Sequence, residues 1–525
     1  MQIVPYPNGE WIGEEDVLPL PEKLTVDYGD FETYCTEMYA IRSGASVQKS
    51  EESAVIQLIR RLDLAPEEYH ISVNNNIKIY AATERGVIWA FTTLFLCSKD
   101  NSYKAGEIQD KPQYSYRGFH LDCARHFFNV DTIEGIIDAA GLAKINVMHW
   151  HLTNDQGWRI ESEQYPLLTK HGEYYSKTDI KRIVLYARKC GIEIIPEINV
   201  PGHTSAVLAA YPQFGCFEKI VPIRDCCGIF PTILCGGKDE TLTFVKGILT
   251  ETAELFPSQY FHTGGDEAPK SEWEKCPHCA SRMADNNIAN TGELQGWMLS
   301  QIAAHLQALG KRTLCWNDGF LDKNYGDNVI VQQWSTEMKK NYTLPYWKSG
   351  GEVIFSDSKY CYFDYPMALT SLKKTYSYVP KLDKTDCSKG ENTLGIECCL
   401  WTESVETPEQ LGERLFPRLF AIAEIGWSNN RNYDRFANNL TIMYDYLDKH
   451  GISYTPLSDS NPTGKVRKQQ IENFLFAAIK DKGKSEDSVK LDVLFVIRLL
   501  FKLFGIGAIP VLYRIIKQRD NSDAS

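Results

Sequence analysis

The chain contains 525 residues, of which 43% are hydrophobic, and it carries a formal net charge of −12. This length and apolar content suffice for a large core and predict two or three domains. The acidic balance disfavours nucleic acid as a partner, because phosphate groups bind to basic surfaces.

The N-terminal segment, MQIVPYPNGEWIGEEDVLPLP, contains neither a basic region nor the apolar stretch of about 7–15 residues that a secretory signal requires. We therefore expect a cytoplasmic protein. The 15 cysteines agree with this expectation, since an odd number cannot pair fully within one chain. Several of them lie in apolar runs that predict buried strands, namely Cys123, Cys315, Cys398 and Cys399.

Residues 1–112 predict a small α+β domain. The run YHISVNNNIKIYAA (69–82) is typical of strands. The runs ESAVIQLIRRLDL (52–64) and ERGVIWAFTTLFLCS (84–98) are typical of helices. None of these segments carries residues that indicate a reaction.

A different rhythm begins at Tyr116 and predicts a second domain over residues 113–455. Short apolar runs alternate with helix-length segments such as DTIEGIIDAAGLAKI (131–145) and ETLTFVKGILTETAELF (240–256). This alternation predicts a parallel α/β sheet, and eight strands predict a closed (β/α)8 TIM barrel. The eight candidate strands are YRGFHLDCAR, INVMHWHL, IEIIPEINV, YFHTGGD, RTLCWND, NVIVQQW, EVIFSDS and LGIECCLW.

Most of these runs end in polar or aromatic residues. The C-terminal ends of barrel strands form the mouth where active sites lie. Aromatic rings there can stack on sugar rings, while fixed polar groups bind the hydroxyls. Carboxylates and an arginine beside them indicate a glycosidase. The residues at the strand ends are Asp122, His151, Asn199, Asp266, Trp316, Trp334 and Trp401.

Six motifs in order make the chain resemble family 20 of the glycoside hydrolases, the β-N-acetylhexosaminidases. The resemblance covers roughly residues 1–450 and implies the barrel and its preceding domain. The motifs are RGFHLDCARHFF (117–128), NVMHWHLTNDQGWRIES (146–162), IPEINVPGHTSA (195–206), HTGGDE (262–267), CLWTE (399–403) and RLFPRLFAIAEIGWS (414–428).

The resemblance implies three catalytic residues. Glu267 corresponds to the general acid/base that protonates the glycosidic oxygen. Asp266 corresponds to the residue that orients the substrate's own 2-acetamido group, whose carbonyl oxygen is the nucleophile and closes to an oxazoline or oxazolinium intermediate. Tyr362 corresponds to the tyrosine that hydrogen-bonds the acetamido oxygen. This substrate-assisted route departs from the usual two-carboxylate arrangement, and no cofactor or metal is expected for it.

The resemblance also implies a substrate pocket. Arg125, Glu403 and Asp364 correspond to groups that bind the sugar hydroxyls, with Asp364 facing the 6-position, so that a 6-sulfate is disfavoured by like charge. The walls of this pocket are expected to be Trp316, Trp334 and Trp401.

Two asparagines depart from the family pattern, which has aspartate at both positions. Asn199 stands where the family supports a histidine, here His203, near the acid/base. An asparagine keeps a hydrogen bond but not the charge, so we expect His203 to lack anionic support. Asn154 is the other departure, and with His151 both asparagines are expected to lie behind the residues that contact substrate.

The motif CPHC at Cys276–Cys279 has the spacing of zinc ligands. No second close Cys/His pair follows it, so the motif supplies half a site. We therefore expect a structural role for these cysteines without a metal.

Residues 456–525 predict a helical C-terminal tail of unknown role. Its segment 489–517 is apolar but is interrupted by Arg498, Lys502 and Arg514, which disfavours a membrane span. Two alternatives remain, namely helices packed on the domain, which we favour, and peripheral membrane contact.

Three functional hypotheses follow. The first is a retaining exo-β-N-acetylhexosaminidase that removes terminal β-linked GlcNAc, or GalNAc, from an oligosaccharide or glycoconjugate. The second is a catalytically silent sugar-binding barrel, and the third is a disaccharide-releasing enzyme of the same family. The oligomeric state is not indicated.

Overall fold

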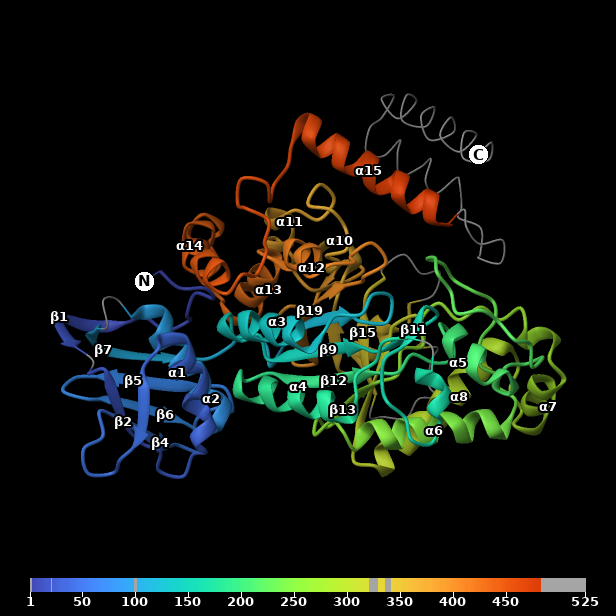
Figure 1. The fold of residues 1–525 in the computed structure, drawn as a ribbon, viewed down its shortest axis with the longest axis horizontal. Helices are drawn as coiled ribbons and strands as arrows, with labels where there is room; N and C mark the ends of the chain where they lie inside the picture. The colour runs from blue at the N-terminus through green and yellow to red at the C-terminus, as the bar shows by residue number, and fades with distance from the viewer. Residues whose placement is uncertain are drawn as a thin grey trace.

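The computed structural model describes residues 2–19, 21–98, 102–170, 172–320, 329–335 and 341–482. Figure 1 shows a small sheet domain, in blue, beside a larger barrel domain. The two predicted architectures, an α+β domain followed by a TIM barrel, are therefore confirmed.

The N-terminal domain is built on a mixed sheet of order β1-β7-β5-β6-β4-β2-β3, with α1 and α2 packed against it. The predicted strands within 69–82 and the predicted helix at 84–98 are confirmed. The elements are β1 (Ile12–Pro19), β2 (Lys23–Asp27), η1 (Thr33–Thr36), α1 (Glu37–Ser43), β3 (Ser46–Lys49), β4 (Ile56–Arg60), β5 (Tyr69–Val73), β6 (Ile77–Ala81), α2 (Glu84–Cys97) and β7 (Ser102–Asp110).

The helix predicted over residues 52–64 is wrong, since this segment contains strand β4. Ile56 and Leu58 are buried, whereas Gln57 and Ile59 are only partly so, and this period of two is that of a strand. Strand β4 pairs with both β2 and β6, so sheet contacts from distant residues determined its conformation.

Eight parallel strands close the barrel. Seven of them lie within the predicted runs, and β19 begins at Thr393, one residue before its run LGIECCLW. Their order around the barrel is β12-β13-β14-β15-β16-β19-β8-β9. The strands are β8 (Tyr116–Asp122), β9 (Val147–His151), β12 (Glu193–Glu197), β13 (Tyr260–His262), β14 (Arg312–Trp316), β15 (Val329–Gln333), β16 (Val353–Phe355) and β19 (Thr393–Leu400).

Helices between the strands cover the barrel (Figure 1), and the two predicted over 131–145 and 240–256 are confirmed as α3 and α6. The helices are α3 (Val130–Leu142), α4 (Lys177–Lys189), α5 (Ser205–Ala210), α6 (Asp239–Ala253), α7 (Pro277–Asp285), α8 (Thr291–Ala308), α9 (Thr343–Lys348), α10 (Ser358–Cys361), α11 (Leu372–Tyr376), α12 (Pro408–Leu415), α13 (Arg418–Trp427) and α14 (Tyr433–Lys449). The short elements are β10 (Thr153–Asn154), β11 (Gly157–Trp158), η2 (Pro166–Thr169), η3 (Pro212–Phe214), η4 (Trp273–Lys275), β17 (Lys381–Leu382) and β18 (Thr385–Asp386).

Side chains fill the barrel in layers, because inward positions recur at every second residue of each strand. An apolar layer includes Ile195, Leu314 and Ile330. Two residues further along these strands, the layer is polar or aromatic and includes Glu197 and Trp316, whose indole Nε1 donates to Glu197 Oε1 at 2.9 Å. The mouth therefore rests on a buried hydrogen-bonded floor.

Buried ion pairs join the two domains. Arg117, at the start of the barrel, donates to Glu67 of the N-terminal domain, and both side chains are buried. Arg42 of α1 lies 2.8 Å from Asp138 of α3 in a second buried pair. These ion pairs fix the orientation of the two domains, and because they are buried they are screened little by solvent.

Helix α15 (Gly464–Lys482) begins the C-terminal tail and crosses over the barrel domain (Figure 1). Its Arg467 donates to the carbonyl of Ala368, and Gln470 accepts from the N–H of the same residue, both at 3.1 Å. The segment 489–517, for which packing and membrane contact were the alternatives, lies outside the described residues. Within the described part of the chain, no helix is both long and apolar enough to cross a membrane.

Candidate active site

The backbone leaves strand geometry directly after β13, as the adjacent acids require. Gly264 and Gly265 have φ values of 66° and 95°, in the left-handed region. A Cβ on Gly264 would lie 2.0 Å from the side-chain oxygen of Asn199, so only glycine fits there. This turn brings the side chains of Asp266 and Glu267 to the same side chain, His203.

His203 lies between the two carboxylates. Its Nε2 is 3.6 Å from Asp266 Oδ2 and 3.6 Å from Glu267 Oε2. Asn199 donates its Nδ2–H to Asp266 Oδ1 at 2.7 Å, so Asp266 is held from two sides. Burial, followed by the charges of Glu197 and Glu267, raises the pKa of Asp266, whereas His203 lowers it.

His203 has an anionic partner, and the expectation that it lacks one is wrong. Asp155 Oδ2 lies 3.0 Å from His203 Nδ1, while Asp155 Oδ1 accepts from the N–H and the hydroxyl of Ser205. Burial alone lowers the pKa of His203, but Asp155, Glu267 and Asp266 outweigh it and raise the pKa well above its usual value. The three carboxylates therefore favour the protonated form of His203.

Ligand atoms of His203, Asp266 and Glu267 lie within 4.8 Å of one another, a spacing that a metal ion could also use. Without an ion, the His203 ring that Asp155 holds at Nδ1 is the positively charged group nearest to both carboxylates.

Asn154 lies further from the carboxylate pair. Its Nδ2 lies 3.0 Å from His151 Nε2, and its Oδ1 accepts from the N–H of Asp155. The other ring nitrogen of His151 is 2.6 Å from Glu197 in the polar floor. Asn154 and His151 thus connect the floor of the barrel to the strand end that carries Asp155.

Asp318 is a site residue that the sequence analysis missed. Its Oδ2 accepts from the backbone N–H of Glu267 at 2.9 Å, and its Oδ1 accepts from Trp334 Nε1 at 2.8 Å. Burial and the nearby Asp266 raise the pKa of Asp318 to about 7. Its position at the end of the predicted strand RTLCWND, two residues after Trp316, could have identified it as a site residue.

An aromatic cluster adjoins these acids, since its Trp334 donates to Asp318. It is a separate hydrophobic group in which Trp316 and Tyr362 are buried and Trp334, Tyr365 and Trp401 are partly buried. The rings of Trp334 and Tyr362 are stacked at 6.0 Å, and those of Trp316 and Trp401 lie 5.8 Å apart. The three predicted tryptophans and Tyr362 therefore come together, with Trp316 buried at the base.

The predicted hydroxyl-binding residues also lie together. Arg125 contacts Asp122 at 3.1 Å and Glu403 at 3.6 Å, and its guanidinium lies 5.0 Å from the centre of the Trp401 ring. Asp364 Oδ1 is buried and has no hydrogen-bond partner among the described residues. Burial and the charge of Glu403 raise the pKa of Asp364 to about 8. These groups form a polar cluster in which Asp364 Oδ1 has no donor among the described residues.

Comparisons with known proteins agree with this architecture. Residues 114–430 match Glycosyl hydrolase family 20, catalytic domain, and residues 1–111 match Glycosyl hydrolase family 20, domain 2. A β-hexosaminidase of Porphyromonas gingivalis is 32% identical over 91% of this chain, and the chain spans 60% of that relative's length. A β-hexosaminidase of Akkermansia muciniphila is 31% identical, over 74% of this chain and 83% of the relative.

Solved structures show the same likeness. The β-N-acetylhexosaminidase of Bacteroides fragilis superposes with a TM-score of 0.79 at 30% identity, over 88% of this chain and 99% of that one. The exo β-N-acetylglucosaminidase of Vibrio harveyi gives a TM-score of 0.77 at 26% identity, over 87% and 78%. The predicted resemblance is confirmed, and the chain belongs to glycosyl hydrolase family 20, carrying both the domain 2 and the catalytic domain of these glycoside hydrolases.

Proposed function

We propose that this chain is a retaining exo-β-N-acetylhexosaminidase that hydrolyses terminal β-linked GlcNAc by substrate-assisted catalysis. The observation that carries the proposal is the carboxylate pair. Asp266 and Glu267 are adjacent and both lie 3.6 Å from His203 Nε2, and the aromatic cluster is joined to them through Asp318, which binds both Trp334 and the N–H of Glu267. A pair so arranged serves two different atoms of one substrate.

In the first step, Glu267 donates a proton to the glycosidic oxygen while that oxygen leaves C1. The carbonyl oxygen of the 2-acetamido group attacks C1 from the other face and closes the oxazolinium ring. Because this nucleophile belongs to the substrate, it acts at a high effective concentration. Asp266 accepts a hydrogen bond from the acetamido N–H, and the Tyr362 hydroxyl donates a hydrogen bond to the acetamido oxygen.

In the second step, water attacks C1 and opens the ring. Glu267, now a carboxylate, takes a proton from this water. Each of the two attacks inverts the configuration at C1, so the overall reaction retains it. The backbone supports this double role, because Asp318 accepts from the N–H of Glu267 and thereby anchors that residue next to the bond. Glu267 keeps a side chain that is 35% exposed, which leaves access for water and for the leaving group.

The terminal sugar would occupy the pocket between the tryptophans and the polar cluster. Asp364 Oδ1, buried and without a partner among the described residues, needs a donor, which a sugar hydroxyl supplies. A carboxylate that binds a hydroxyl of the terminal sugar favours release of one sugar over a disaccharide. GlcNAc is our first choice, since the similar Vibrio harveyi enzyme is named an exo β-N-acetylglucosaminidase and was solved with N-acetylglucosamine; a panel that includes GalNAc glycosides decides between the two sugars.

Two variants assayed on two leaving groups test the proposal. Glu267→Gln should lower kcat by about 10²–10⁴-fold on a chitooligosaccharide, but less on an aryl β-GlcNAc, whose good leaving group needs little protonation. Asp266→Asn should impair both substrates, since both need the oriented acetamido group. The exposed Glu254→Gln serves as the control and should keep wild-type rates.

Three outcomes decide the matter. Wild-type hydrolysis that releases the β-anomer first, seen by NMR, and inhibition by a thiazoline analogue of the oxazoline both support the proposal. Full activity in both variants would exclude these residues from catalysis. A wild-type chain that binds GlcNAc without hydrolysing any glycoside would instead support the silent sugar-binding barrel.

A further inference from the structure

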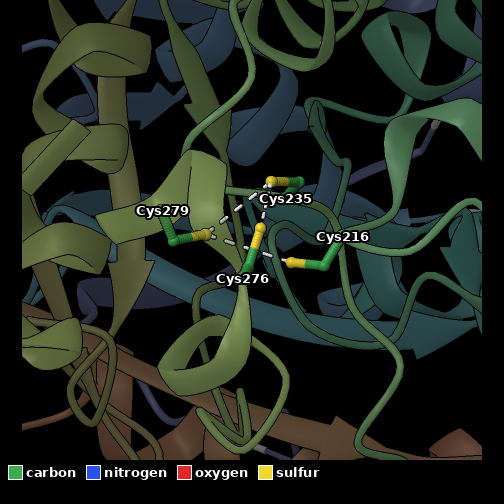
Figure 2. A group of neighbouring side chains, drawn as sticks. All are labelled: Cys216, Cys235, Cys276 and Cys279. Atoms are coloured by element: carbon green, nitrogen blue, oxygen red, sulfur yellow. Dashed lines mark hydrogen bonds between the residues drawn. The ribbon is translucent and has the colours of Figure 1, made fainter. Parts of the chain in front are cut away.

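Four buried cysteines meet outside the active site. Figure 2 shows the sulfur atoms of Cys216, Cys235, Cys276 and Cys279 pointing toward one another. All four side chains are at least 95% buried, and their sulfurs lie within 4.8 Å of one another. The motif CPHC supplies two of them, and the partners that the sequence analysis did not find lie at 216 and 235, too distant in the chain to form a recognisable pair.

The distances between the sulfurs identify the arrangement. Sγ of Cys235 lies 3.8 Å from that of Cys276 and 3.7 Å from that of Cys279, which lies 3.9 Å from that of Cys216. A disulfide requires about 2.05 Å, so these are separate thiols. A tetrahedral zinc ion with Zn–S bonds of about 2.3 Å places its sulfurs about 3.8 Å apart.

The backbone around the sulfurs is packed to bring the two segments together. A Cβ on Gly237 would lie 2.2 Å from the carbonyl carbon of His278, so the chain next to Cys235 touches the chain next to Cys279. Trp273, fully buried, donates its Nε1–H to the carbonyl of Leu234 at 2.9 Å and lies against Gly236. The segments that carry Cys235 and Cys279 are therefore held together by packing that does not involve the sulfurs.

Two of the four cysteines lie at the start of a helix. Cys276 is the N-cap of α7 and Cys279 lies in its first turn, where the helix dipole stabilises negative charge. Thiolates are the form that binds a metal ion.

We propose that Cys216, Cys235, Cys276 and Cys279 bind one zinc ion as a tetrathiolate. Four thiols lose four protons as one Zn²⁺ binds, which leaves a net charge of −2 at the site. Tetrahedral sulfur ligands suit zinc or iron. A polynuclear iron–sulfur cluster would hold the cysteines further apart, because several irons and sulfides lie between them, so these spacings fit a single ion.

The proposed ion would clamp two loops of the catalytic face. Cys216 and Cys235 follow β12 and α5, and Cys276 and Cys279 follow β13, so the ion cross-links the segments that continue from His203 and from Glu267. Leu234 donates its N–H to the carbonyl of Pro201, two residues before His203, at 3.1 Å. The site is thus structural: it positions the loops without touching the reacting atoms.

Metal analysis of the full chain tests the proposal. We expect purified wild type to contain about one zinc per chain by inductively coupled plasma mass spectrometry, and Cys279→Ala and Cys216→Ala to contain less than a fifth of that. Cys387→Ala is the matched control, since Cys387 is equally buried but lies outside the cluster, and it should keep its zinc. Zinc content is read independently of hydrolysis, so the result stands apart from the proposed function.

A second measurement on wild type guards against variants that fail to fold. Zinc exchanged for Co²⁺ should give the thiolate charge-transfer and visible bands of a tetrahedral S₄ site, and an organomercurial should release the metal. Wild type without zinc, wild type with one iron in its place, or an intact mass showing disulfides among the four cysteines would each overturn the proposal. Equal loss of zinc in Cys387→Ala would also overturn it.

Discussion

Asp155 Oδ2 lies 3.0 Å from His203 Nδ1, and His203 in turn faces both Asp266 and Glu267 at 3.6 Å. Asp155 thus controls the charge next to the catalytic pair without contacting it. Asn199 donates to Asp266 and orients it, whereas Asp155 stabilises the positive charge of His203.

Removal of the Asp155 charge should shift the pH profile. Asp155→Asn lowers the pKa of His203, so the ring becomes neutral at a lower pH and Asp266 loses its positive neighbour. The pKa of Asp266, already raised by burial, then rises further. The acid limb of kcat/KM on an aryl β-GlcNAc should therefore move to higher pH.

A surface carboxylate provides the control for that shift. Asp434→Asn, at the exposed start of α14, changes the net charge equally and should leave the limb in place. An Asp155→Asn limb that stays at the wild-type pH, or moves to lower pH, would contradict the role given to His203.

Discrimination against a 6-sulfated sugar should depend on pH. Burial and the charge of Glu403 raise the pKa of Asp364 to about 8, so the group is neutral below that pH and anionic above it. The preference for GlcNAc over 6-sulfo-GlcNAc, measured as a ratio of kcat/KM, should rise on the order of tenfold as the pH passes through 8. Asp364→Asn should flatten this dependence, and a ratio that falls with pH in wild type would contradict it.

The turn at Gly264 should tolerate no side chain. Gly264→Ala places a Cβ 2.0 Å from Asn199 Oδ1 at a φ of 66° and should lower the free energy of unfolding by about 1–3 kcal/mol. It should also lower kcat, because Asn199 holds Asp266. Gly451→Ala is matched in φ, at 66°, with open space around it, so it isolates the backbone cost. Equal melting temperatures of the two variants would contradict the steric argument.

The barrel and its mouth could be predicted because their information is local. Most of the strands are short apolar runs that end in a polar or aromatic residue. The strand and the site residue that it positions are therefore neighbours in the sequence. The structure brings Asp266, Glu267, Tyr362 and the three tryptophans to one face accordingly.

Partners that lie far apart in the chain escaped prediction. Asp155 and His203 are 48 residues apart, and Asp318 and Glu267 are 51 apart. The local sequence pattern does not indicate which of the loops that follow the barrel strands contact one another. The same holds for Cys235 and Cys276, 41 residues apart, and for strand β4, whose conformation depends on pairing with β2 and β6.

The buried pair of Arg117 and Glu67 should be a major contribution to the stability of the two-domain unit. Glu67→Gln leaves the Arg117 charge buried without its counter-ion and should lower the free energy of unfolding by about 3–5 kcal/mol, measured by urea denaturation at pH 7. Glu84→Gln breaks the partly exposed pair with Arg60 and should cost about 1 kcal/mol or less.

The pH dependence of this loss distinguishes the ion pair from packing. Burial acts to raise the pKa of Glu67, but Arg117 outweighs it and the pKa is lowered from 4.5. The unfolded chain therefore binds the proton first, and the stability from this group is present above about pH 4.5 and declines below it as the folded carboxylate becomes protonated. The difference in the free energy of unfolding between wild type and Glu67→Gln should accordingly decrease as the pH falls below that value. A difference that stays constant from pH 7 to pH 3 would show that the loss comes from packing.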